Sequence, residues 1–164
     1  AAVVTLRDPA VPLNGAVLNG ISVGDYTDGD VTQLIQGGVT PIRVTGGETA
    51  IVRGITTRTL TSGEADATWR EINTILIIDN VIPGVRDVLR GMFSRAKNTQ
   101  QTRGAIRTQV VVELENKVEA GIIDSYGEVI VTQNSADPTI CDVEFEFAVA
   151  HGINQILLSA YITV

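Results

Sequence analysis

The sequence has few of the residues that build disulfides, metal sites or catalytic pairs. Cys141 is the only cysteine and His151 the only histidine among 164 residues. A single cysteine excludes an internal disulfide and a zinc site made of several thiolates. His151 lies in a predicted turn, and we interpret it as a turn or surface residue rather than a general base. We therefore predict no catalytic, cofactor-binding or metal-binding residue, and we predict that the chain is not an enzyme.

Two motifs that could bind ligands have simpler explanations. Gly46-Gly47 lacks the following helix and the lysine of a phosphate-binding loop, so we interpret it as a tight turn. Asp25, Asp28 and Asp30 could bind a cation, but they lack the spacing of an EF-hand loop. Thr27 and Asp30 instead have the spacing that caps the start of a helix, which we predict over residues 28–36.

Aromatic side chains and long apolar runs are also scarce. Aromatic residues are 4% of the chain, so aliphatic side chains and threonine must provide most of the packing. The apolar fraction of 44% is still sufficient for a sizeable core. The longest apolar runs are far shorter than a membrane span, and no signal-peptide pattern is visible. The net charge of −7 argues against nucleic acid. We predict no membrane insertion and no nucleic-acid partner.

Positive charge is concentrated in the middle of the chain. Six of the twelve basic residues lie in one short segment: Arg86, Arg90, Arg95, Lys97, Arg103 and Arg107. After Thr108, nine acidic residues are accompanied by Lys117 as the only basic residue. The two regions could be solvated faces, or they could pair within one molecule or between copies. We predict that the six basic residues contact a partner protein or a neighbouring copy.

Apolar residues at helical spacing predict two long helices. The first stripe, between Thr68 and Lys97, consists of Ile75, Ile78, Ile82, Val85, Leu89 and Met92. Pro83 interrupts this stripe, so we predict either one kinked helix or two helices on one surface. Residues 97–104 are expected to form a loop. A second stripe consists of Ile106, Val110, Leu114 and Val118, and Gly121 ends it.

Alternating apolar residues predict strands on both sides of these helices. We expect a hairpin around Gly46-Gly47, a polar loop over residues 61–66, and strands near Val129 and over residues 143–149. The last strand is expected to bury Ile156, Leu158, Ala160, Ile162 and Val164. The fold class is therefore α+β, with a mostly antiparallel sheet packed against two long helices. We assign residues 1–20 to a linker or the end of a preceding segment, and residues 21–164 to one domain.

Several segments, taken in order, resemble one family. DPAVPLNG, LIQGGVTPIRV, AIVRGITTRTL and TWREIN are similar to the tail sheath proteins of contractile phages, especially the Mu-like branch. TRGAIRTQVVVELENKVEAGII and SADPTICDVEFEFAVAHGINQILLSAYITV continue the resemblance, which covers the chain from about Asp8 to its end. Val11 departs from the family, where many members have a basic residue. Pro83 departs too, because it interrupts a helix that is usually continuous.

The resemblance implies a structural role in a contractile tail of a phage or prophage. Subunits of this family polymerise around a tail tube and contract to drive the tube through the host envelope, for ejection of the genome into the host. The implied partners are other sheath subunits, the tail tube, the baseplate and the tail terminator. The implied location is the virion tail, after assembly in the cytoplasm of the host bacterium.

The resemblance also implies that the C-terminal strand augments the sheet of a neighbouring subunit, so that Ile156, Leu158, Ala160, Ile162 and Val164 would form a subunit interface. Full-length relatives carry an N-terminal arm and outer domains, so we expect this sequence to be a fragment. The alternatives are another tail or secretion-machine component, such as a tube or baseplate protein, and a small enzyme or ligand-binding domain.

Overall fold

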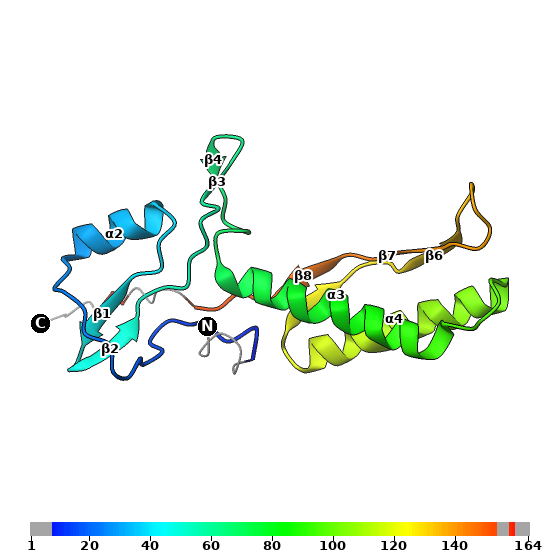
Figure 1. Cartoon of the computed structure of the whole chain (residues 1–164), viewed down its shortest axis with the longest axis horizontal. Coiled ribbons are helices and arrows are strands. Elements are labelled where there is room, and N and C mark those ends of the chain that lie inside the picture. The colour runs from blue at the N-terminus through cyan, green and yellow to red at the C-terminus, as the bar shows by residue number, and fades with distance from the viewer. Residues whose placement is uncertain (1–7, 154–157, 160–164) are drawn as a thin grey trace, which may run out of the picture. The chain divides into compact units, whose positions relative to one another are not determined.

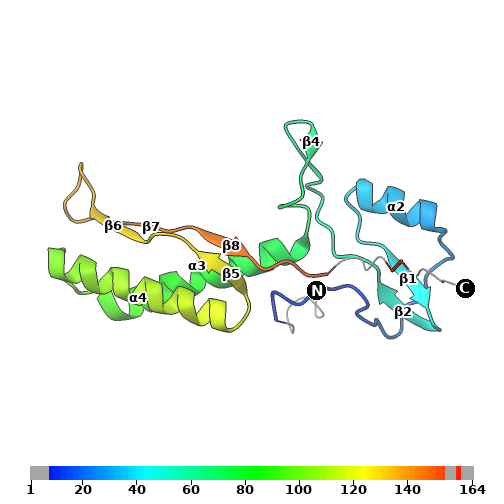
Figure 2. The same cartoon turned by 180° about the vertical axis from the view of Figure 1, so that it is seen from behind.

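The computed structural model describes residues 8–153 and 158–159, which divide into two compact units. The N-terminal unit contains Val11–Asn73 and the described residues from His151 onward. The helical unit contains Asp8–Ala10 and Thr74–Ala150. Figures 1 and 2 show the elements of each unit from two opposite sides. The strand expected over residues 156–164 lies outside the described residues, apart from Leu158 and Ser159.

The N-terminal unit begins with the helix and the hairpin that the sequence predicts. Helix α2 spans Asp28–Gln36, and Thr27 and Asp30 form a capping box at its start. Strands β1 (Ile42–Thr45) and β2 (Glu48–Ile51) pair antiparallel. Gly46 and Gly47 have φ angles of 63° and 88°, which confirms the tight turn that Gly-Gly indicates.

A small core holds the loop around Leu13 against strand β2. Leu13, Ala16 and Ile51 are buried together, and Ile72 packs against them. The backbone N–H of Gly15 donates to the carbonyl oxygen of Ile51 at 2.8 Å. The loop is therefore attached to the hairpin by both backbone and apolar contacts.

Residues 61–66 differ from the predicted loop. Strands β3 (Leu60–Thr61) and β4 (Glu64–Ala65) form a short antiparallel hairpin instead. Ser62 and Gly63 both have positive φ angles, 53° and 87°, as the turn of a two-residue hairpin requires. The strands contain too few residues for their alternation to be recognised in the sequence.

Helix α3 spans Ile72–Phe93 and remains one helix with Pro83 in its interior. The apolar stripe predicted for this helix is wrong except at Val85 and Leu89, which belong to the core cluster. The buried residues are Thr74, Ile77, Val81 and Val85, so of the predicted stripe only Val85 is fully buried. Ile82 is 38% exposed and Met92 is 60% exposed. The helix carries apolar residues on two adjacent rows, and periodicity alone did not identify the row that faces the core.

Helix α4 spans Gln100–Glu119, with the Thr99 hydroxyl accepting from the N–H of Thr102 at its start. The expected loop over residues 97–104 therefore ends at Thr99, because this capping threonine starts the helix earlier than its apolar stripe does. The stripe itself is confirmed, because Ile106, Val110 and Leu114 are buried. Gly121 follows the helix with a φ angle of 69°.

The chain after α4 folds into a long, irregular antiparallel ribbon. Strand β5 (Ile123–Tyr126) pairs with β8 (Phe147–Val149), and β6 (Ile130–Gln133) pairs with β7 (Cys141–Glu144). Figures 1 and 2 both show this ribbon alongside α3 and α4. Four side chains of β7, β8 and the residues between them pack against the buried core cluster: Val143, Phe145, Phe147 and Val149.

The α+β class is confirmed, but the strands do not join into one sheet. In the described residues they form four separate two-stranded antiparallel pairs. No described helix is both long enough and apolar enough to cross a membrane.

The corrected stripe on α3 can be tested with two isoleucines of the same helix. Ile77 is fully buried, so Ile77→Ala should lower the free energy of unfolding by about 2–5 kcal/mol, through lost burial and a residual cavity. Ile82→Ala, at a partly exposed site, should cost less than about 1 kcal/mol. Urea unfolding followed by circular dichroism measures both. An equal or larger loss for Ile82→Ala would contradict the orientation of the helix described here.

Candidate functional site

The described residues contain no group of three or more His, Cys, Asp and Glu that could hold a metal ion. Two of the three aspartates considered above, Asp28 and Asp30, have structural contacts. Asp30 caps α2, and the Asp28 carboxylate lies 2.5 Å from the Arg43 guanidinium. Burial raises the pKa of the Cys141 thiol, with Arg103 acting in the opposite direction. His151 is exposed.

The six basic residues of the basic surface lie on α3, on α4 and in the loop between them. Arg86 and Arg90 lie one turn apart on the exposed side of α3. Arg95 and Lys97 are exposed in the loop that follows. Arg103 lies in the first turn of α4, and Arg107 follows one turn later. All six residues that the sequence singled out therefore lie on the α3–α4 hairpin, and their contact with a partner stays a prediction.

Most of this basic surface has no carboxylate partner in the described chain. Arg107 Nη2 lies 3.7 Å from Glu128 Oε1, with both side chains exposed. Arg103 Nη1 donates to Asn98 Oδ1 at 2.9 Å. Asn98 in turn donates to the carbonyl oxygens of Pro138 and Ile140, which attaches the loop to the ribbon turn. The other four basic residues have no ion pair within 4 Å among residues 8–153 and 158–159.

Most residues of the predicted C-terminal interface are not described by the structure. Ile156, Ala160, Ile162 and Val164 lie outside the described residues. Leu158 is described, and 91% of its surface is exposed. The assignment of this segment to a subunit interface stays a prediction from the sequence.

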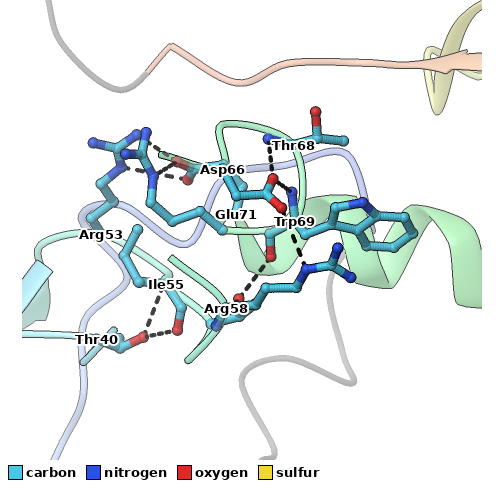
Figure 3. Close-up of polar contacts among 10 residues, drawn as sticks. Thr40, Arg53, Ile55, Arg58, Asp66, Thr68, Trp69 and Glu71 are labelled. Atoms are coloured by element: carbon cyan, nitrogen blue, oxygen red, sulfur yellow. Dashed lines mark hydrogen bonds and ion pairs between the residues drawn. The ribbon is translucent and has the colours of Figure 1, made fainter. Parts of the chain in front are cut away.

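Sequence reasoning missed a polar network that organises the β3–β4 hairpin (Figure 3). Asp66 is only 8% exposed, and its carboxylate accepts from the Thr61 hydroxyl. Its other oxygen accepts from the backbone N–H groups of Thr68 at 3.0 Å and Trp69 at 2.8 Å. The sequence did contain a signal for this turn. Asp66 lies two residues before Thr68 and three before Trp69, and an aspartate at this spacing often accepts hydrogen bonds from the backbone of a turn.

Two arginines complete this network. The Arg58 guanidinium lies 5.2 Å from the centre of the Trp69 ring, and its Nε lies 3.4 Å from the Asp66 carboxylate. Arg53 forms an ion pair with Glu71 beside it (Figure 3). These contacts connect the base of the hairpin to the segment before α3.

Acid should weaken the Asp66 network. The Thr61 hydroxyl, followed by the Trp69 and Thr68 N–H groups and Arg58, lowers the pKa of Asp66 below its usual 3.8, although burial acts in the opposite direction. A carboxyl with a lowered folded-state pKa stabilises the fold above its unfolded pKa. That stabilisation is lost as the pH falls through the folded pKa. Asp66→Asn should therefore have a lower melting temperature than wild type at pH 7. Below pH 4, its melting temperature should decrease less than that of wild type.

The matched control is Glu64→Gln, which removes an exposed carboxylate from the same hairpin. Thermal melts of the three proteins between pH 2 and pH 7 measure the effect. A melting temperature for Asp66→Asn that follows wild type at every pH would show that the network contributes nothing.

One family model and several solved structures match this chain. The model of the phage tail sheath C-terminal domain matches residues 64–163. A chain in the baseplate of the anti-feeding prophage has 18% identity and a TM-score of 0.80, with 99% of this chain and 48% of that chain covered. A chain in the contracted PVC sheath complex, an extracellular contractile injection system, has 18% identity, a TM-score of 0.76 and the same coverage.

A sheath tail protein from Listeria innocua has 11% identity and a TM-score of 0.70, with 89% of this chain and 39% of that chain covered. At these identities the likeness shows the fold alone, and this chain spans at most about half the length of the solved chains. No curated protein matches. Because the family model covers more than half of its residues, this chain belongs to the phage tail sheath C-terminal domain family.

Proposed function

We propose that this chain is part of a structural subunit of a contractile tail sheath. The sheath would polymerise around a tail tube and contract to drive the tube through the host envelope. The match of residues 64–163 to the sheath domain carries this proposal. The similarity of the fold to a chain of a contracted sheath complex supports it. Residues 21–164 would form the core domain of the subunit, preceded by a linker.

The surfaces of the chain suit a protein that functions by assembly. Four exposed basic side chains have no carboxylate partner among the described residues, which leaves them available to another protein. The C-terminal residues alternate between apolar and polar, which suits a strand that adds to the edge of a neighbouring sheet. The proposed partners are other sheath subunits, the tail tube, the baseplate and the tail terminator, and the proposed location is the virion tail.

A baseplate component is the second candidate function. The observation that favours it is the similarity to a chain in the anti-feeding prophage baseplate. Electron microscopy of the full-length product separates the two candidates. A sheath subunit should form tubes or stacked rings, and a baseplate component should form discrete assemblies of limited size. Compact monomers under all conditions would overturn both candidates.

The C-terminal strand should be required for polymerisation. Deletion of residues 156–164 from the full-length protein should abolish tubes, because it removes the backbone donors, the acceptors and the apolar row that would augment a neighbour. The deletion should leave the circular dichroism spectrum and the melting temperature of the remainder almost unchanged. Electron microscopy measures tube formation, and tubes of normal length would rule out this role for the strand.

The basic surface should make assembly sensitive to salt. Reversal of Arg86 and Arg90 to Glu should slow sheath growth on isolated tubes. Because both side chains are exposed, the free energy of unfolding should change by only about 0.5 kcal/mol. Raising the salt concentration should slow the wild type as well, since exposed charges more than about 10 Å apart are screened at 0.1 M salt. If the residues are only solvated, neither change will affect the growth rate.

A further inference from the structure

The charges of helix α4 have the order that the helix dipole disfavours. Arg103 lies in the first turn and Glu119 in the last turn, whereas the start of a helix favours anions and its end favours cations. Lys117 in the last turn is an exception, and its Nζ lies 3.7 Å from Glu113. The helix dipole therefore does not explain the placement of Arg103 and Glu119 on α4.

The ribbon has an acidic outer face. Around the junction of β7 and β8, Phe145 and Phe147 pack against the core cluster, while Glu144 and Glu146 are exposed. Ile130 pairs with Glu144 across the ribbon and is 44% exposed. A shallow hollow of about 330 Å³ is lined here by Glu128, Ile130, Glu144, Phe145 and Glu146. The face thus combines an exposed isoleucine with several carboxylates.

Helix α3 has an outer row with the opposite charge. Ile82, Arg86 and Arg90 are spaced by four residues, so they follow one another along the same side of the helix. Ile82 is 38% exposed, and both arginines are exposed. This side is away from Ile77 and Val81, which are fully buried. The row therefore combines an exposed isoleucine with two cations that lack a carboxylate partner in the part of the chain described.

The row and the acidic face cannot meet within one molecule. Each points away from the core that α3 and the ribbon share, because each lies opposite the buried side of its own element. Within one copy, the basic and acidic regions touch at the exposed pair Arg107–Glu128. Full pairing of the two surfaces therefore requires a second copy.

We propose that the row Ile82, Arg86 and Arg90 of one copy docks on the acidic face of a second copy, where Glu144 and Glu146 line the same hollow as Ile130. The two surfaces differ, so the contact is heterologous and repeats from copy to copy as a ring or helical array. The identity of that array as a sheath rests on the proposed function. In this proposal, the basic row binds a neighbouring copy rather than the tube.

Disulfide trapping in the whole chain tests this contact. All chains carry Cys141→Ser, which removes the native thiol. A chain with Ile82→Cys is mixed with a chain carrying Ile130→Cys under mild oxidation, and cross-linked dimers are counted on non-reducing gels. The control partner carries Leu60→Cys, which is also an exposed apolar position but lies on the β3–β4 hairpin. The Ile82–Ile130 pair should cross-link several-fold faster than the control, and added salt should remove the difference.

Charge exchange adds a second measurement on the same cysteine pair. Arg86→Glu with Arg90→Glu in the first chain should slow cross-linking, and so should Glu144→Arg with Glu146→Arg in the second. Mixing the two reversed chains should restore the rate, because opposite charges again face each other. Unchanged melting temperatures exclude unfolding as the cause of slower cross-linking. A rate equal to that of the control pair, or no recovery in the reversed mixture, would overturn the contact.

These outcomes are distinguishable from a failure of the proposed function. If electron micrographs show tubes but Ile82–Ile130 cross-links do not form, the proposed sheath function stands and this contact is refuted. The basic row would then be free to face the tube. If salt-sensitive cross-links form but the full-length protein makes no tubes or rings, the contact stands and the proposed sheath function is refuted.

Discussion

The helical unit depends on the apolar seam between α3 and α4. Ile77, Val81 and Val85 from one helix share a buried cluster with Ile106, Val110 and Leu114 from the other. Each fully buried aliphatic side chain contributes roughly 1.5–3 kcal/mol. The ribbon adds its own inward side chains to this seam. With so few aromatic residues in the chain, these aliphatic contacts fix which sides of the helices and the ribbon remain exposed.

The exposed sides follow from that seam. Once Ile77 and Val81 face the core, Arg86 and Arg90 must face outward, and the alternation of the ribbon places Glu144 and Glu146 outside as well. The function proposed for the chain therefore lies in its surfaces rather than in a cavity. A subunit that assembles needs rigid elements to present such surfaces.

The β3–β4 hairpin of the N-terminal unit depends on polar contacts, whereas the helical unit depends on its aliphatic seam. The β3–β4 hairpin is only a few residues long and has little apolar surface to bury, with Leu60 60% exposed. Asp66 compensates by accepting hydrogen bonds from Thr61, Thr68 and Trp69. Such a network is sensitive to protonation of its carboxylate, whereas the aliphatic seam is not.

The sequence by itself determined the α+β class, the capped helix α2, the Gly46-Gly47 hairpin and the stripe of α4, because each depends on local spacing or local backbone conformation. It also indicated the basic cluster and the sheath family. Tertiary structure alone decided which apolar row of α3 is buried, since Ile75, Ile78 and Ile82 have the same periodicity as Ile77 and Val81. It also decided that the strands form separate pairs and that Asp66 is buried, because both depend on contacts that local spacing does not encode.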